Sequence, residues 1–279
     1  MKPKLAIGLL TVAAILAWTG VAGAQTAPPT PDLLDRLAVL EATVQALHAK
    51  VTALETEVAT LKSSQVMALN QYLTVTTGDQ PRALFSGLNL QLDNGTGQTD
   101  STNGRGNLIL GYDAARHDEM YFCSDGQFTE REACERAGQT WTTSHKTGSH
   151  YLVIGDRNNY AQYGGLVVGT YNTSTGPGAS VSGGRENKAS GPYANVSGGT
   201  GNAARGPYTS VSGGESNAAN GPAATVSGGT YNIANGAAAS VNGGEFNTAS
   251  GSAASVSGGL QRSATGPQDW VAGGLIQDQ

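Results

Sequence analysis

The chain has 279 residues, a formal net charge of −5 and 40 glycines, while aromatic residues make up 6% and charged residues 13%. A chain this poor in large side chains lacks the material for the thick core of a globular enzyme. Its acidic balance also lacks the basic patch that nucleic-acid binding requires. We therefore expect no nucleic-acid partner. Since neither a Gly-x-Ser-x-Gly motif nor a nucleophile–histidine pairing is present, we expect no enzymatic activity.

The N-terminus has the pattern of an export signal. Lys2 and Lys4 precede an apolar run over residues 5–21, and Ala22-Gly23-Ala24 supplies a small-residue cleavage site before Gln25. This pattern predicts that residues 1–24 are a signal peptide. The mature protein is then extracellular, on the cell surface or in the periplasm, where disulfides persist. An uncleaved leader is the alternative, and it is the one way in which we expect this chain to meet a membrane.

A heptad pattern follows the leader. Residues 25–31 hold three prolines and are expected to form a linker, after which Asp32 is placed to cap a helix. Valine fills most a positions and leucine every d position of a seam whose steps alternate three and four: Leu37, Leu40, Val44, Leu47, Val51, Leu54, Val58 and Leu61. One helix cannot bury such a seam alone, so we expect residues 32–68 to form a parallel coiled-coil stalk.

Charges beside the seam indicate how the helices pair. Arg36 and Glu41 are the first of several pairs of opposite charge five residues apart, as a parallel, in-register assembly requires. The segment from Arg36 to Glu41 also resembles the known R-h-x-x-h-E trimerisation motif, and Lys50 to Glu55 is a lysine variant of it. The motif favours a homotrimer. Valine at the a positions leaves a dimer open, and an amphipathic helix packed on its own domain is the other alternative.

The stalk is joined to the next part of the chain by residues 69–111. Within the link from Leu73 to Leu92, a strand pair is suggested by Leu84, Leu88, Leu90 and Leu92, with alternation clearest from Leu88 to Leu92. Residues 93–106 are polar and glycine-rich, which predicts a loop. Residues 106–111 then read as a first, degenerate coil of the repeats that follow.

An insertion over residues 112–147 is richer in charge than the rest of the chain. Its cysteines, Cys123 and Cys134, are expected to form a disulfide in an exported protein, with Trp141 packed nearby. A metal or redox role is the alternative, although no C-x-x-C is present. If the chain binds a specific ligand, this insertion is our first candidate, because it departs from the repeat and projects from it.

Histidines and carboxylates in or beside the insertion raise the alternative of a metal site. The residues concerned are His117, Asp118, Glu119, His145 and His150. Their spacing matches no known ligand pattern. We therefore expect solvated loop residues and no cofactor.

A 15-residue repeat dominates residues 148–279. A valine recurs at this step and is followed by Gly-Gly: Val181, Val196, Val211, Val226, Val241, Val256 and Val271. An asparagine keeps the same step: Asn187, Asn202, Asn217, Asn232 and Asn247. The consensus is A-S-V-S-G-G-x-x-N-x-A-x-G-x-x.

The repeat length predicts an all-β solenoid. Fifteen residues suffice for two short strands and two turns, and alternation in A-S-V-S sends alanine and valine inward and serine outward. The glycines suit turns with positive φ, and the asparagines can form a hydrogen-bonded ladder. Each coil buries only one valine and a few alanines, which is marginal against chain entropy. Several rolls packed together would bury more, so thin coils also favour oligomerisation.

The Val-Ser-Gly-Gly and Asn-x-Ala-x-Gly elements resemble the head repeats of trimeric autotransporter adhesins. The resemblance covers about residues 164–274, with degenerate coils at 106–111, 149–155 and 165–169. It implies a left-handed parallel β-roll that trimerises and attaches to host surfaces or matrix. The chain departs from that family in two ways: we expect no C-terminal membrane anchor, and here the stalk precedes the roll.

Together these patterns predict a secreted or surface-associated structural or adhesive homotrimer that binds a surface, extracellular matrix or glycan through its β-roll. A glycan-binding or ice-binding module is the alternative. A β-helical polysaccharide-degrading enzyme is the hypothesis least favoured, because the repeat faces carry serine, asparagine and alanine where such enzymes need a groove of carboxylates.

Overall fold

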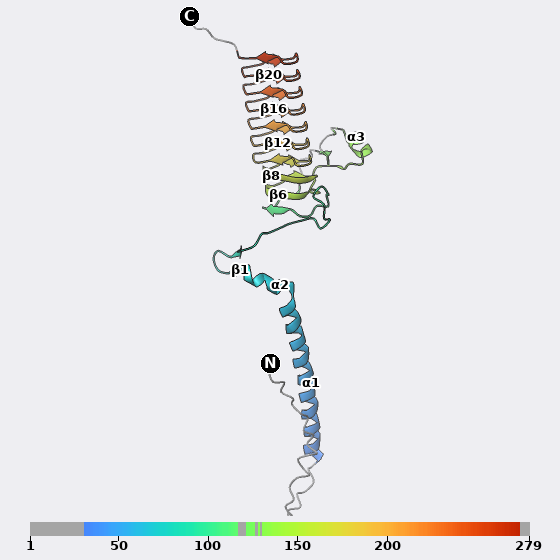
Figure 1. Cartoon of the computed structure of the whole chain (residues 1–279). Coiled ribbons are helices and arrows are strands. Elements are labelled where there is room, and N and C mark those ends of the chain that lie inside the picture. The colour runs from blue at the N-terminus through green and yellow to red at the C-terminus, as the bar shows by residue number, and fades with distance from the viewer. Residues whose placement is uncertain (1–30, 117–120, 126–127, 129, 274–279) are drawn as a thin grey trace, which may run out of the picture. The chain divides into compact units, whose positions relative to one another are not determined.

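The computed structural model describes residues 31–116, 121–125, 128 and 130–273 (Figure 1). The predicted signal peptide and most of the predicted linker lie outside the described residues. The chain divides into two compact units at Asn89 and Leu90, and each is taken by itself.

The first unit consists of helical segments followed by a hairpin. Helix α1, Pro31–Ser63, has 33 residues and is continued by the short helix α2, Gln65–Ala68, and the 3-10 turn η2, Leu69–Gln71. Strands β1, Leu73–Thr76, and β2, Arg82–Phe85, pair antiparallel. None of the helices within the described residues combines the length and apolar character that crossing a membrane requires.

Two local expectations in this region are wrong. Asp32 lies inside the first turn and is not the N-cap, because α1 begins at Pro31; proline is favoured at the first helical position, where no N–H is needed. The alternating segment Leu88 to Leu92 forms no strand, and Leu90 is 60% exposed. Alternation stabilises a strand only where a partner covers its apolar face, and this face has none among the described residues.

The second unit is a parallel β-solenoid, which confirms the fold class predicted from the repeat. One wall, here called the valine sheet, has ten strands. They are β3 Leu108–Leu110, β6 Ser149–Asp156, β8 Tyr163–Thr170, β10 Ser180–Val181, β12 Asn195–Val196, β14 Ser210–Val211, β16 Thr225–Val226, β18 Ser240–Val241, β20 Ser255–Val256 and β22 Trp270–Val271.

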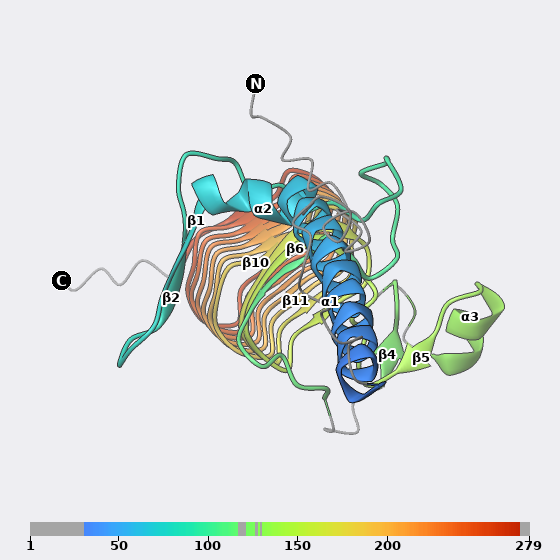
Figure 2. The same ribbon diagram turned by 90° about the horizontal axis from the view of Figure 1, so that it is seen from below.

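The facing wall, here called the alanine sheet, has eight strands (Figure 2). They are β7 Asn159–Tyr160, β9 Thr173–Ser174, β11 Lys188–Ala189, β13 Ala203–Ala204, β15 Ala218–Ala219, β17 Ile233–Ala234, β19 Thr248–Ala249 and β21 Ser263–Ala264. From β6 onward, successive strands alternate between the two walls, so each coil from β6 to β21 contributes one strand to each sheet.

The coil length changes along the stack. Val181 pairs with Val196, a step of 15 residues, whereas Val153 pairs with Val167, a step of 14. Every valine of the repeat from Val181 to Val256 is buried between the walls, and Val271, in the last described coil, packs partly buried against them. Alanines that the A-S-V-S pattern directs inward are buried with them, while the neighbouring serines face outward.

The first coils hold larger side chains than the later ones. Tyr151 and Tyr160 are buried with Val153 and Val167, and the two tyrosine rings lie 5.4 Å apart between centroids. Burial raises the pKa of Tyr151 to about 12, against the opposing effect of the hydrogen bond with Ser174. These aromatic rings give the base of the solenoid a larger apolar interior than the alanine-lined coils have.

Buried asparagines form a continuous ladder along the stack. In one rung the Asn217 side-chain amide donates to the Gly213 carbonyl at 2.9 Å and to the Gly229 carbonyl at 2.8 Å. Its Oδ1 accepts the backbone N–H of Asn232 at 2.9 Å. The same three bonds recur at Asn187, Asn202, Asn232 and Asn247. Each asparagine thereby satisfies a turn carbonyl in its own coil and an N–H in the next, and adds a second hydrogen bond to a carbonyl that already accepts a backbone N–H.

The expectation that the repeat glycines all serve positive-φ turns is only partly right. Gly229 has φ +84°, but Gly221 does not have a positive φ. A Cβ at Gly221 would lie 2.1 Å from the carbonyl oxygen of Gly236 in the next coil. Glycine is needed there because adjacent coils approach too closely for any side chain.

Candidate functional site

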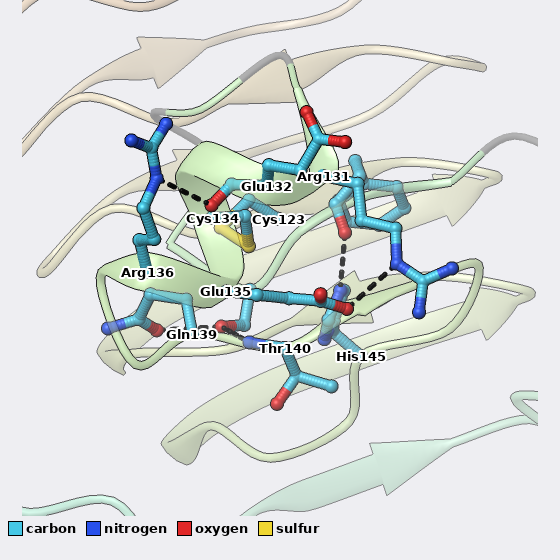
Figure 3. Close-up of a disulfide and its surroundings, with 11 residues drawn as sticks. Cys123, Arg131, Glu132, Cys134, Glu135, Arg136, Gln139, Thr140 and His145 are labelled. Atoms are coloured by element: carbon cyan, nitrogen blue, oxygen red, sulfur yellow. Dashed lines mark hydrogen bonds and ion pairs between the residues drawn. A yellow bond between two sulfur atoms is a disulfide. The ribbon is translucent and has the colours of Figure 1, made fainter.

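The insertion folds as a small disulfide-linked subdomain beside the first coils. Strands β4, Phe122–Cys123, and β5, Trp141–Thr142, pair antiparallel, and helix α3, Arg131–Arg136, connects them. The predicted disulfide between Cys123 and Cys134 is formed, with Trp141 opposite Cys123 in the hairpin (Figure 3). The bond therefore ties the hairpin to the helix.

Long basic side chains fix the insertion against the alanine sheet. Arg116 donates to Thr173 Oγ1 at 3.1 Å and to the Tyr171 carbonyl, and it is buried. The ammonium of Lys188, from β11, lies 5.7 Å from the Phe122 ring centroid. Burial lowers the pKa of Lys188, and Arg205 lowers it further. The outer face of the alanine sheet is thus covered where the insertion lies (Figure 2).

A buried ion pair joins the start of the insertion to its end. Lys146 Nζ lies 2.7 Å from Asp113 Oδ1, and the Tyr160 hydroxyl donates to Asp113 Oδ2 at 3.2 Å. Burial, followed by the nearby Asp113 carboxylate, raises the pKa of Tyr160. The contacts of Asp113 hold the two ends of the insertion at one coil.

A polar cavity of about 350 Å³ lies between the insertion and the first coils. Hydroxyl and amide side chains dominate its lining: Thr102, Ser124, Gln139, Thr140, Thr142, Ser144, His145, Thr147, Ala161 and Gln162. Among the residues that the structure describes, the lining contains no carboxylate, lysine or arginine. It therefore suits a neutral, hydroxyl-bearing ligand better than an ion.

His145 closes one side of this cavity. Its Nε2 lies 3.0 Å from the Phe122 carbonyl oxygen, and it donates because a carbonyl only accepts. Burial lowers the pKa of His145, the Phe122 carbonyl opposes that effect, and Lys188 adds to it. The nearby Ser124 hydroxyl donates to Gln139 Oε1 at 2.7 Å. His145 is thus a structural donor, and Ser124 is not paired with a base.

The residues considered for a metal site are not gathered into one. His150 is held by the 93–106 loop, accepting from the Asn94 N–H at 3.3 Å and contacting the Thr99 carbonyl at 3.2 Å. His117, Asp118 and Glu119 lie outside the described residues. Among those described, no group of three histidine, cysteine or carboxylate side chains could hold an ion.

The outer face of the valine sheet changes character along the stack. In the first three coils it carries aliphatic side chains, here called the base face: Leu108, Leu110, Leu152, Ile154, Leu166 and Val168. Leu108 and Leu110 are 41% and 50% exposed. At the matching positions of later coils stand small polar residues such as Ser180 and Ser182. The base face is an apolar patch that the insertion leaves open.

The heptad seam of α1 is exposed along its whole length. No residue of α1 is buried, and the seam side chains from Leu37 to Leu61 are 38–59% exposed. Arg36 and Glu41 are exposed beside it. Within the described residues, the chain supplies no surface that covers this stripe.

Two aromatic pairs on the solenoid corners were not predicted from the sequence. Tyr193 and Tyr208 stack, as do Tyr231 and Phe246. Each pair is separated by one repeat, so the 15-residue step was the signal that could have revealed them.

Comparison of the chain with protein-family models and with curated proteins finds no match.

Proposed function

We propose that this protein is an exported structural or adhesive homotrimer, held together by its stalk and by the first coils of its roll. The exposed seam of α1 carries the proposal. Leaving eight aliphatic side chains in water over four heptads is costly, and burying them between parallel helices recovers roughly 25 cal/mol per Å² of apolar surface.

The base face supports the same assembly from a different part of the chain. Its aliphatic side chains sit on the wall opposite to the insertion, so a second copy can approach without meeting the insertion. Aliphatic residues such as Ile154 stop where the coils become regular and serine takes over. We propose that neighbouring copies pack here. The upper coils would then stay solvated and present their outer faces.

The resemblance to adhesin head repeats supports a left-handed trimeric roll that attaches to a surface, matrix or glycan. The N-terminal leader supports export. The proposal includes no catalysis. A glycan-binding module is the second candidate, and it is favoured by the neutral hydroxyl and amide lining of that cavity.

The test is the mass of residues 25–279 by light scattering, with variants chosen as a matched pair. Leu40→Glu places a charge in the seam, whereas Val39→Glu places one at an adjacent, 67% exposed position outside it. The first should dissociate the stalk and the second should not. Ile154→Glu, combined with Leu40→Glu, should complete dissociation. A wild-type monomer, or a double variant that keeps the wild-type mass, would overturn the proposal.

A further inference from the structure

The first observation is a pair of stacked tyrosines on one corner of the solenoid. Tyr193 and Tyr208 occupy the same turn in successive coils, with ring centroids 5.4 Å apart and an interplanar angle of 8°. They are 56% and 65% exposed. Two large aromatic rings held parallel in water form a rigid apolar surface on an otherwise polar stack.

The backbone conformation at these two positions is unfavourable for a tyrosine. Tyr193 and Tyr208 have φ of +55° and +58°, a left-handed conformation that bulky side chains rarely adopt. Glycine takes the same corner in the coil below, at Gly178, and alanine takes it in the coil above, at Ala223. Folding therefore does not require an aromatic ring at this corner, so the presence of two rings there indicates a role other than folding.

The neighbours leave one ring face open. A Cβ at Gly178 would lie 2.7 Å from the Tyr193 ring, so that ring rests directly on the Gly178 backbone. Tyr193 in turn covers one face of Tyr208. On the far side of Tyr208, the corner positions of the next three coils are Ala223, Ala238 and Ala253. We call this open ring face with its alanine shelf the tyrosine step.

Polar groups run beside the tyrosine step. Arg205 donates to Asn220 Oδ1 at 3.1 Å, and the Asn220 amide donates to Asn235 Oδ1 at 2.8 Å. Arg205 and Asn220 stand three residues before Tyr208 and Ala223 in their coils. An open aromatic face beside a row of amide and guanidinium groups matches the two surfaces of a pyranose ring, whose C–H face is apolar and whose rim bears hydroxyls.

We propose that the tyrosine step binds a pyranose unit of an unbranched, neutral β-1,4-linked glucan. In such glucans the hydroxyls are equatorial, so the ring face presented to Tyr208 consists of C–H bonds. The inference rests on the proposed adhesive function, for which it names the ligand class and the contact.

The opposite corner repeats the arrangement. Tyr231 and Phe246 stack with centroids 5.0 Å apart and an interplanar angle of 2°, and both are 46% exposed. Ser216 occupies the same corner in the coil below. Two platforms on each chain, multiplied in a trimer, would give useful avidity for a polymer even when each contact is weak.

The test is titration of residues 25–279 with cellohexaose, followed by calorimetry and by NMR saturation transfer. In a Phe246→Ala background, which removes the second platform, Tyr208→Ala should weaken binding at least tenfold, whereas Tyr208→Phe, which keeps the ring face, should retain it. Tyr112→Ala removes a fully exposed tyrosine that stacks on nothing and should bind as the wild type does. Maltohexaose, whose α-linkages turn successive rings, should bind more weakly.

Light scattering and thermal melting of the same samples separate the two proposals. A folded wild-type trimer that binds no cellohexaose, or a Phe246→Ala trimer that binds it equally well with Tyr208→Ala, would overturn the tyrosine step and leave the trimer standing. A wild-type monomer that still loses binding with Tyr208→Ala in that background would overturn the trimer alone.

Discussion

At the scale of single residues, the asparagine ladder should dominate coil stability. Asn217→Ala leaves the Gly213 carbonyl and the Asn232 N–H without a partner, and it removes one of the two hydrogen bonds that the Gly229 carbonyl accepts. Each buried group left unsatisfied costs about 1–3 kcal/mol. We expect a loss of several kcal/mol in the free energy of unfolding, measured with urea.

Ser212→Ala is the control for that substitution. Ser212 lies in the same coil but faces solvent, so its replacement should change the free energy of unfolding by less than about 0.5 kcal/mol. Equal effects at the two positions would mean that the ladder adds nothing beyond ordinary turn geometry.

His145 should make the insertion sensitive to acid. Burial lowers its pKa from the ordinary 6.5, so the unfolded chain takes up the proton at a higher pH than the folded one. Stability is therefore full above about pH 6.5 and falls as the pH drops from there toward the lowered pKa. His145→Gln keeps a donor for the Phe122 carbonyl but does not titrate. The wild type should lose melting temperature between pH 7.5 and 5 by more than this variant does.

Residue roles could be inferred from the sequence only where neighbouring coils repeat them. The positions of the buried valines and the asparagine ladder followed from the 15-residue step, because equivalent positions in successive coils have the same surroundings. The reason for Gly221 did not, since its constraint is the carbonyl of the next coil and not its own φ. The stacked tyrosines were missed because only two coils carry them.

At the scale of elements, the disulfide should stabilise the insertion and not the solenoid. Closing a loop with a sequence separation of 11 is worth about 2–3 kcal/mol in the chain-entropy model. Replacing both cysteines by serine should therefore accelerate amide hydrogen exchange in α3, at Arg131–Arg136. Amides of the regular coils, such as those of Asn195–Val196, serve as the internal control and should keep their protection. Uniform acceleration throughout would contradict the separation of the two.

Element prediction succeeded where burial is local and failed where partners are distant. The base coils were recognised from short apolar runs, whereas the strand pair suggested by Leu84 to Leu92 lies earlier in the chain, at β1 and β2. The alternation at Leu88–Leu92 led to a wrong strand prediction. A strand also needs a partner that covers its apolar face, and the sequence pattern does not show whether one is present. The cavity beside the insertion joins residues from Thr102 to Gln162, and its shape depends on contacts such as that of Arg116 with Thr173. The repeat spacing of the sequence does not indicate contacts between such distant residues.

At the scale of the whole molecule, the solenoid should behave as a stack whose coils interact only with their neighbours. Its strand pairs join coil to next coil, with the same register from Val181 to Val271. Stability is then close to a sum of coil and interface terms, and removal of one complete coil leaves the remaining interfaces intact.

Deleting residues 213–227 removes one full repeat and joins Ser212 to Gly228, which preserves the consensus on both sides. We expect this variant to fold, with a melting temperature within a few degrees of the wild type, by circular dichroism. Deleting residues 213–220 instead brings positions of the alanine sheet into the phase of the valine sheet. Because that shift moves the inward valines of later coils to outward positions, with Val226 at the place of Ala218, the upper stack should lose its protease resistance. Equal damage from both deletions would mean that the upper coils depend on contacts beyond their neighbours.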